Sequence, residues 1–111
     1  MTKYKTQLNN DILVNLFIVA CEGGSNYWCK SIKPKYKTKD RYESMLDGFG
    51  VVPLEDEIKT IQVSKNDIAE AVSLLWVKTP HVLKAIIDDS YDAGDADCFF
   101  QLCVFKEVIY G

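Results

Sequence analysis

The sequence predicts a single α+β domain spanning residues 1–111, with a short antiparallel sheet packed against three or four helices and a central C-terminal helix. Three observations predict this fold. The chain has 111 residues and is 48% hydrophobic, which suffices for one domain with its own core. Apolar residues recur at helical spacing in several segments, and strand-like segments lie between the first helical segment and the later ones. No internal repeat or low-complexity segment interrupts this order.

The first helix is predicted over residues 9–22, where an asparagine can cap its start and apolar residues recur every three to four positions. Gly23 ends this helix and Gly24 lets the chain reverse, since glycine adopts the backbone conformations that a helix terminus and a sharp turn require. We expect the chain to turn there into a strand over residues 26–33.

The middle of the chain has weaker patterns. Residues 33–42 are polar at almost every second position and contain Pro34, which suits a loop or an edge strand. Residues 43–56 hold two glycines and a proline between scattered apolar residues, so we expect a loop that tucks a few side chains inward. Residues 57–63 alternate well enough to be a second strand.

Helices follow this second strand. Ser64 and Asp67 have the spacing of a capping box, and the apolar positions after them predict a helix. Thr79 and Pro80 end that helix and start another, because proline cannot continue the hydrogen-bond ladder but fits a first turn. Residues 88–94 are expected to form a loop.

The last helix is predicted to begin at a cap provided by Asp95 or Asp97. Its body, residues 98–105, is apolar on all sides except at Gln101, so the helix should be central. A buried glutamine amide without partners costs about 1 to 3 kcal/mol, so we expect Gln101 to have a partner within the chain, in a ligand or in a second subunit.

Charge is unevenly divided along the chain, which carries a net charge of -3. Residues 1–54 hold eight basic and five acidic residues, whereas residues 55–111 hold five and eleven. Six of the basic residues lie between positions 30 and 41, and five acids lie between positions 88 and 97. The acidic total argues against general binding of duplex nucleic acid, although a local anion site is compatible with it.

No segment of the sequence predicts a membrane span, since the longest apolar run, residues 16–21, is far below the ~20 residues that a helix needs. The N-terminal residues lack a signal-peptide pattern, so we expect a cytoplasmic protein. In that compartment Cys21, Cys29, Cys98 and Cys103 are expected to be thiols, and their spacing does not favour zinc.

Catalytic motifs are missing from the sequence: it has no phosphate loop, no nucleophile elbow and a single histidine, His81. We therefore expect a protein that is not an enzyme and that uses no cofactor or metal. An enzyme would need a titratable pair joined by the fold, such as Glu22 with His81 or Asp97 with Lys106. The acids between positions 88 and 97 lack the ligand order of a calcium loop, and helix capping explains them.

The most informative segment is the turn that follows the first helix. Its glycines allow close approach of the backbone, its polar side chains offer hydrogen bonds, and its two aromatic rings can stack on a base. The alternative is a helix cap that leads into a strand, with one aromatic ring in the core. We expect the following residues to bind a phosphate-containing ligand: Gly24, Ser25, Asn26, Tyr27, Trp28, Arg41 and Gln101.

Both ends of the chain resemble a family of small proteins of bacteriophages and prophages. The matching residues after the first helix are Gly23, Gly24, Asn26, Tyr27 and Trp28. Near the C-terminus they are Asp95, Ala96, Asp97, Gln101, Phe105, Glu107 and Gly111. The chain departs from the family pattern at Ser25, where an aliphatic residue is common, and at Lys106, where a glycine is expected.

The resemblance implies a phage origin and action in the cytoplasm of an infected bacterium. Our leading hypothesis is a phage-encoded, non-enzymatic binding protein and anti-defence factor that sequesters a nucleotide immune signal at an oligomer interface. The alternatives are an inhibitor that binds a host defence protein directly, through an acidic face at Asp88, Asp89 and Asp92 that imitates nucleic acid, and a small structural or accessory phage protein.

Overall fold

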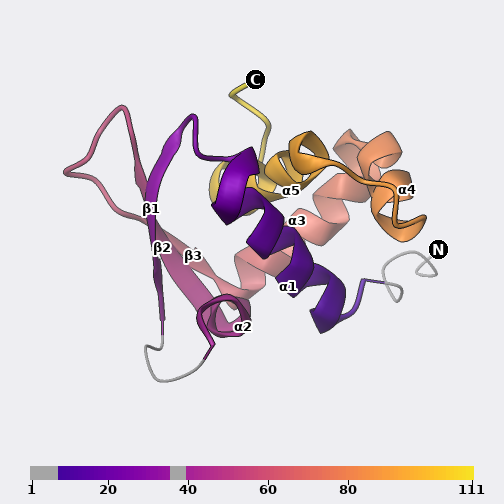
Figure 1. Cartoon of the computed structure of the whole chain (residues 1–111), viewed down its shortest axis with the longest axis horizontal. Helices are drawn as coiled ribbons and strands as arrows, with labels where there is room; N and C mark the ends of the chain where they lie inside the picture. Colours follow the sequence, from indigo (N-terminus) through magenta and orange to yellow (C-terminus); the bar gives the residue numbers. More distant parts are fainter. Residues whose placement is uncertain (1–7, 36–39) are drawn as a thin grey trace.

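The computed structural model describes residues 8–35 and 40–111 and has the expected α+β fold. Strands β1 (Cys29–Pro34), β2 (Gly48–Pro53) and β3 (Ile61–Ser64) form one sheet in that order, and each neighbouring pair is antiparallel. The helices lie on one side of this sheet and fill the right-hand part of the view in Figure 1. None of the helices in residues 8–35 and 40–111 covers the other face of the sheet (Figure 1).

The first helix is confirmed as α1 (Asn10–Val19), which continues into a π-helical turn, η2 (Ala20–Gly24). Asn9 caps α1, because its Oδ1 accepts a 3.0 Å hydrogen bond from the backbone N–H of Ile12. Strand β1 begins at Cys29, later than expected. The reason is a turn at residues 25–28, where the N–H groups of Trp28 and Cys29 both donate to the carbonyl of Ser25.

The prediction of a loop over residues 43–56 was wrong. This stretch contains the end of a one-turn helix, α2 (Arg41–Ser44), a 3-10 turn, η3 (Met45–Asp47), and the central strand β2. All six residues of β2 are buried, and the strand pairs with a neighbour on each side. Its glycines and proline give it a poor local preference for strand, but burial and pairing on both sides outweigh that preference.

The second predicted strand is confirmed in part. The strand β3 covers only the end of the segment predicted over residues 57–63, whose first residues belong to the loop after β2. Ile58 in that loop is 97% exposed, so its apolar side chain mimics a strand pattern without being buried. Local alternation alone does not distinguish these two cases.

The later helices agree with the expected capping and restart signals. In α3 (Lys65–Lys78) the Ser64 side chain accepts from the backbone N–H of Asp67, whose carboxylate accepts in return from the N–H of Ser64. Pro80 occupies the first turn of α4 (Pro80–Ile87), where its missing N–H costs nothing.

The start of the last helix corrects the sequence prediction. Helix α5 (Ala93–Phe105) is capped by Asp92, with Asp95 as the reciprocal partner of a second capping box. Neither Asp95 nor Asp97 is the N-cap. The first turn was missed because several aspartates share the spacing that a cap requires, and the choice among them depends on which one the rest of the fold buries.

The centre of the molecule is α5, as expected, and it packs on α1, η2 and α3. Four phenylalanine rings from three elements meet there: Phe17 of α1, Phe49 of β2, and Phe99 and Phe100 of α5. Phe49 and Phe100 stack with ring centroids 5.5 Å apart, and Phe17 meets Phe49 edge to face at the same distance. This cluster joins the sheet to the helical layer.

Candidate functional site

The turn at residues 25–28 packs against α5 through one buried carboxylate, that of Asp97. Its Oδ1 accepts hydrogen bonds from Ser25 Oγ and Trp28 Nε1, both at 2.7 Å. Its Oδ2 accepts from the Tyr27 hydroxyl at 2.6 Å and from Gln101 Nε2 at 2.9 Å. Four donors therefore stabilise a carboxylate that is only 5% exposed, as a buried charge requires.

Gln101, one helical turn further along α5, connects this carboxylate to the C-terminal segment. Its Oε1 accepts from the backbone N–H groups of Ile109 (2.8 Å) and Tyr110 (2.9 Å). Its Nε2 donates to the carbonyl of Tyr110 at 3.2 Å as well as to Asp97. The hydrogen-bond partners expected for Gln101 thus lie within the chain, and the amide is completely buried.

The two aromatic residues of the turn have different environments. Trp28 is 2% exposed, and the Tyr110 ring stacks on its indole with centroids 5.5 Å apart and an interplanar angle of 5°. Tyr27 is 52% exposed, although its hydroxyl is bonded to Asp97. Desolvation first, and then the bond to Asp97, raises the pKa of Tyr27 to about 12.

This geometry revises the expected binding turn. Three of the expected residues are buried and form their hydrogen bonds within the protein: Ser25, Trp28 and Gln101. The ring face of Trp28 that we expected to stack on a ligand is covered by Tyr110. Gly24 serves packing: a Cβ there would lie 2.5 Å from the carbonyl oxygen of Ala93. The helix-cap alternative describes this segment best, with Trp28 as its core residue.

The remaining expected residues lie toward the surface. Asn26 and Arg41 are exposed and line one small cavity of about 50 Å³ with Lys30 and Cys21. Arg41 also donates to the carbonyl of Ile32 on the edge strand β1, at 3.4 Å. This cavity is smaller than a nucleotide, so it does not by itself form the nucleotide site expected at Arg41.

Members of the two titratable pairs considered for an enzyme bond to other residues instead. Lys106 pairs with Asp67 at 2.5 Å and approaches Glu70 at 3.7 Å, whereas Asp97 bonds only to neutral donors among the described contacts. Glu22 accepts from the Tyr42 hydroxyl at 2.7 Å.

The four cysteines are free thiols in the structure, and burial raises the pKa of each of them. In residues 8–35 and 40–111, no group of three or more histidine, cysteine or acidic side chains is placed to hold a metal. The acids near α5 are explained by capping at Asp92 and Asp95, by burial of Asp97 and by an ion pair between Asp88 and Lys84.

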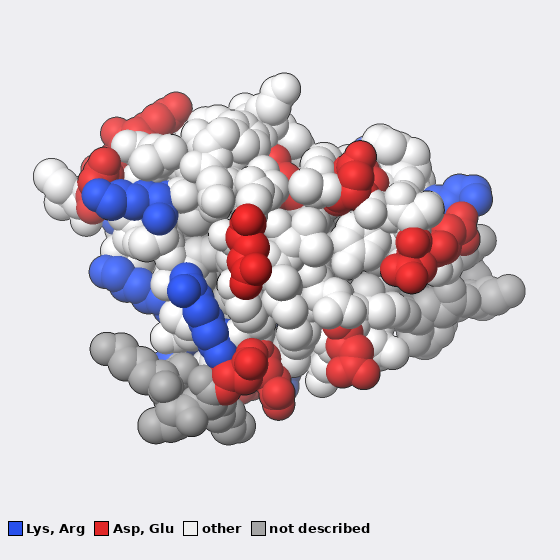
Figure 2. Space-filling model, viewed as in Figure 1, with Lys and Arg blue, Asp and Glu red and all other residues white. Residues whose placement is uncertain are grey.

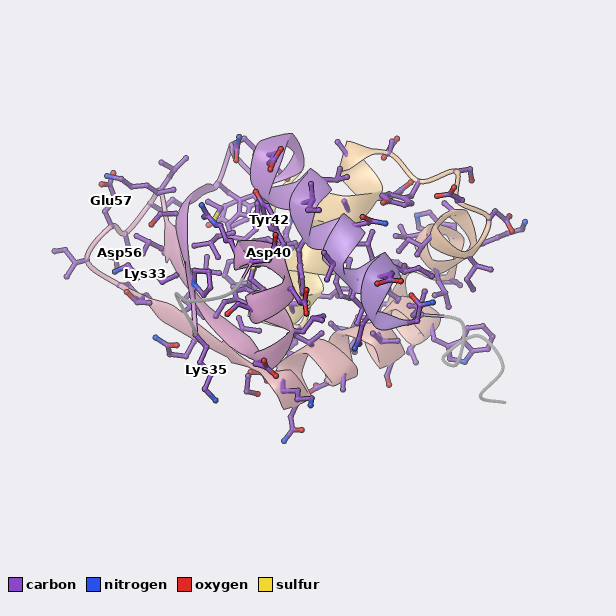
Figure 3. All side chains as sticks on the ribbon, turned by 60° about the horizontal axis from the view of Figure 1, so that its bottom comes forward. Lys33, Lys35, Asp40, Tyr42, Asp56 and Glu57 are labelled. Carbon is purple, nitrogen blue, oxygen red and sulfur yellow. The ribbon has the colours of Figure 1, made fainter. Side chains whose placement is uncertain are left out.

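A larger hollow, which we call the sheet groove, lies where β1, β2, β3 and the start of α3 meet. It has a volume of about 580 Å³ and is lined by residues that include Lys33, Lys35, Gly48, Gly50, Gln62 and Lys65. Figure 3 labels Lys33 and Lys35, which lie toward the sheet side of the molecule. This volume falls in the range of small-molecule sites.

Two glycines form the floor of the sheet groove. Gly50 pairs with Lys33 on one side and with Gln62 on the other, so these three residues lie in one row across the sheet. A Cβ at Gly50 would approach the Thr60 side chain to 2.9 Å, and Gly48 has a φ of 129° that suits glycine alone. A glycine inside a central strand commonly marks close approach by another group.

Basic side chains slightly outnumber acidic ones in the lining of the sheet groove. Three lysines and two aspartates line it, and one of these aspartates, Asp67, already pairs with Lys106. Figure 2 shows several basic side chains gathered over the sheet side, whereas acidic side chains are spread across the molecule and also lie beside the basic ones. The uneven division of charge along the sequence therefore separates only in part on this face of the molecule.

The sequence reasoning did not find the sheet groove, although two signals for it were present. Lys33 and Lys35 flank Pro34 at the end of β1, and Lys35 itself lies just beyond the strand. Gly50 interrupts a segment that contains Phe49, Val51 and Val52, as a glycine within a strand does. The glycine signal was hidden because the segment containing Gly50 was predicted to be a loop.

No helix in the described part of the chain has the length and apolar character that a membrane span requires. None of the protein-family models matches the chain, and neither a curated protein nor a solved structure shows significant similarity to it.

Proposed function

We propose that the protein is a non-enzymatic binding protein that holds a small phosphate-containing ligand in the sheet groove. The observation that carries the proposal is the row formed by Lys33, Gly50 and Gln62 across the sheet, beside the sheet groove. It places a cation and an amide, which can donate and accept hydrogen bonds, on either side of a glycine. The site thus moves from the turn at residues 25–28, where the sequence suggested it, to the sheet.

The resemblance to phage proteins supports a more specific form of this proposal. In that form the ligand is a nucleotide immune signal, which the protein sequesters in the cytoplasm of an infected bacterium as an anti-defence factor. A protein that removes a signal by binding needs affinity but no catalytic groups, and the groove offers lysines and amides of that kind.

Calorimetric titration with adenosine monophosphate, a cyclic dinucleotide and inorganic phosphate tests the proposal. We expect saturable binding of a nucleotide, and we expect the double variant Lys33→Gln with Lys35→Gln to weaken it at least tenfold. The matched control is Lys84→Gln, which removes a lysine from α4, outside the groove lining. Equal affinity in the double variant and the control, or no binding of any of the three probes, would contradict the proposal.

One observation favours the alternative of a protein inhibitor. A hollow of about 270 Å³ between α3 and α4 is lined by Trp76, Pro80, Leu83 and Ile87, and Trp76 is 40% exposed. Exposed aromatic rings beside an apolar hollow are typical anchors of protein interfaces, and Asp88 adds an acidic rim. If the titration finds no nucleotide, Trp76→Ala is the first variant to compare with the wild-type protein in capture of a host partner.

A further inference from the structure

The C-terminal segment, residues 107–111, is held in a seat that recognises its backbone. The two N–H groups that Gln101 Oε1 accepts belong to Ile109 and Tyr110, and the carbonyl that receives Gln101 Nε2 is that of Tyr110. These are main-chain contacts in which two consecutive N–H groups converge on one oxygen, so the segment bends at Ile109 and Tyr110 and is not paired as a strand. The seat therefore recognises the backbone of this bent segment.

One side chain of the segment completes the seat. The Tyr110 ring lies flat on Trp28 and meets Phe105 and Tyr27 at centroid distances of 5.8 and 6.5 Å. The next side chains on the segment, Val108 and Ile109, are 41% and 50% exposed. The segment thus combines a partly buried aromatic anchor with two apolar residues that its own domain covers only in part.

The connection from α5 to this segment is strained. Lys106 ends α5 with a φ of 65°, the left-handed conformation that residues with a Cβ disfavour. Its backbone carbonyl accepts from Lys78 Nζ at 3.1 Å, and its side chain pairs with Asp67. These contacts hold the reversal that brings the segment back onto its own domain, and an extended connection would release the strain.

We propose that two copies of the chain exchange residues 107–111, so that the Tyr110 of each copy stacks on the Trp28 of the other. The occupant of the seat is then a second copy of this chain, to which the seat is complementary because it already holds the same residues. Exchange of an identical segment is a low-cost route to a dimer, and a strained hinge favours it. Val108 and Ile109 become part of the new interface.

The expected strength of this dimer follows from the competition within one chain. A segment on a short connection has an effective concentration of about 1 mM for its own seat. Release of the strain at two hinges, together with cover for two apolar side chains per copy, favours the exchanged form. We therefore expect a dimer dissociation constant of about 10 to 100 μM, which is below the effective concentration of about 1 mM.

Light scattering after size-exclusion chromatography, over a concentration series that spans this range, tests the exchange. Lys106→Gly removes the strain at the hinge and is expected to shift the protein to a monomer. Lys106→Ala is the matched control, since it removes the same ion pair but retains a Cβ in the left-handed conformation, and it should remain dimeric. A wild-type protein that is monomeric throughout, or a dimer that both variants leave unchanged, would overturn the proposal.

A complementation experiment distinguishes exchange from other dimers. Tyr110→Ala damages the segment and Gln101→Leu damages the seat, so each variant alone lacks a good pairing. Mixed together, an exchanged dimer joins the intact seat of one variant to the intact segment of the other, and native mass spectrometry should show a heterodimer. Two folded variants, checked by circular dichroism, that stay monomeric in the mixture would refute exchange; if either is unfolded, the comparison at Lys106 decides. Neither test involves the sheet groove.

Discussion

The indole Nε1 of Trp28 donates a 2.7 Å hydrogen bond to Oδ1 of Asp97, across 69 residues of sequence. Ser25 shares the same carboxylate oxygen, and Gln101 connects the other oxygen to the C-terminal segment. The turn after the first helix, the last helix and the C-terminal segment are therefore joined by one buried polar network.

Replacing the central carboxylate should strongly destabilise the protein. In Asp97→Asn, the side-chain amide has one acceptor oxygen for the four donors that now surround the carboxylate. The buried indole N–H of Trp28 can only donate, so it cannot accept from the new NH₂ group. We expect the free energy of unfolding to fall by about 2 to 4 kcal/mol in urea denaturation. Asp56→Asn, at an exposed loop position, is the control and should change it by less than about 0.5 kcal/mol. Equal stability of the two variants would show that the network contributes little.

The two adjacent glycines after α1 should respond differently to alanine. A Cβ at Gly24 would overlap the carbonyl oxygen of Ala93, whereas a Cβ at Gly23 meets nothing within 4 Å. We expect Gly24→Ala to lower the free energy of unfolding by about 1 to 3 kcal/mol, as overpacking does. Gly23→Ala should be neutral or slightly stabilising. Thermal unfolding of both variants measures this difference, and a reversed order would contradict the packing of η2 against α5.

Alkaline pH should weaken the network through Tyr27. The pKa of Tyr27 is raised from 10.0 to about 12 in the folded protein, first by desolvation and then by the hydrogen bond to Asp97. A raised pKa means that the neutral form stabilises the fold below pH 10, and that this contribution is lost as the pH rises from about 10 to about 12. Tyr27→Phe should remove this part of the decline when melting temperatures are compared across that interval. An unchanged decline would assign it to other tyrosines.

Acid should act through the ion pair at the start of α3. Hydrogen bonding from Lys106, and then from the backbone of Ser64, lowers the pKa of Asp67 below its ordinary value of 3.8. A lowered pKa stabilises the folded protein above about pH 4, and this contribution is lost as the pH falls through the folded value. Lys106→Met should make stability less dependent on pH in that interval. Parallel acid-unfolding curves for the two proteins would show that the pair is fully screened.

The sequence was sufficient for α1, α3 and α4, because their signals are local. The Ser64 and Asp67 capping box, the restart at Pro80 and the apolar face of α3 depend on neighbours three or four residues away, and all three are present in the structure. It was also sufficient to require a partner for Gln101, since a buried amide without one is costly whatever the fold.

Other features depended on contacts that no local pattern encodes. Strand β2 contains residues that disfavour strands, and it exists because β1 and β3 pair with both of its edges. Asp92 rather than Asp95 caps α5, and Asp97, in the next turn of the same helix, is buried against Trp28.

The sequence by itself thus determined the class of the fold, the capped starts of α1 and α3, the start of α4 at Pro80, and the need of Gln101 for a partner. Only the tertiary structure decided which partners Gln101 has. In that structure Tyr110 covers Trp28, and Lys33 and Gln62 line the sheet groove. The physical reason is that burial and strand pairing are properties of segments far apart in the chain, whereas capping and helical periodicity arise within a few residues.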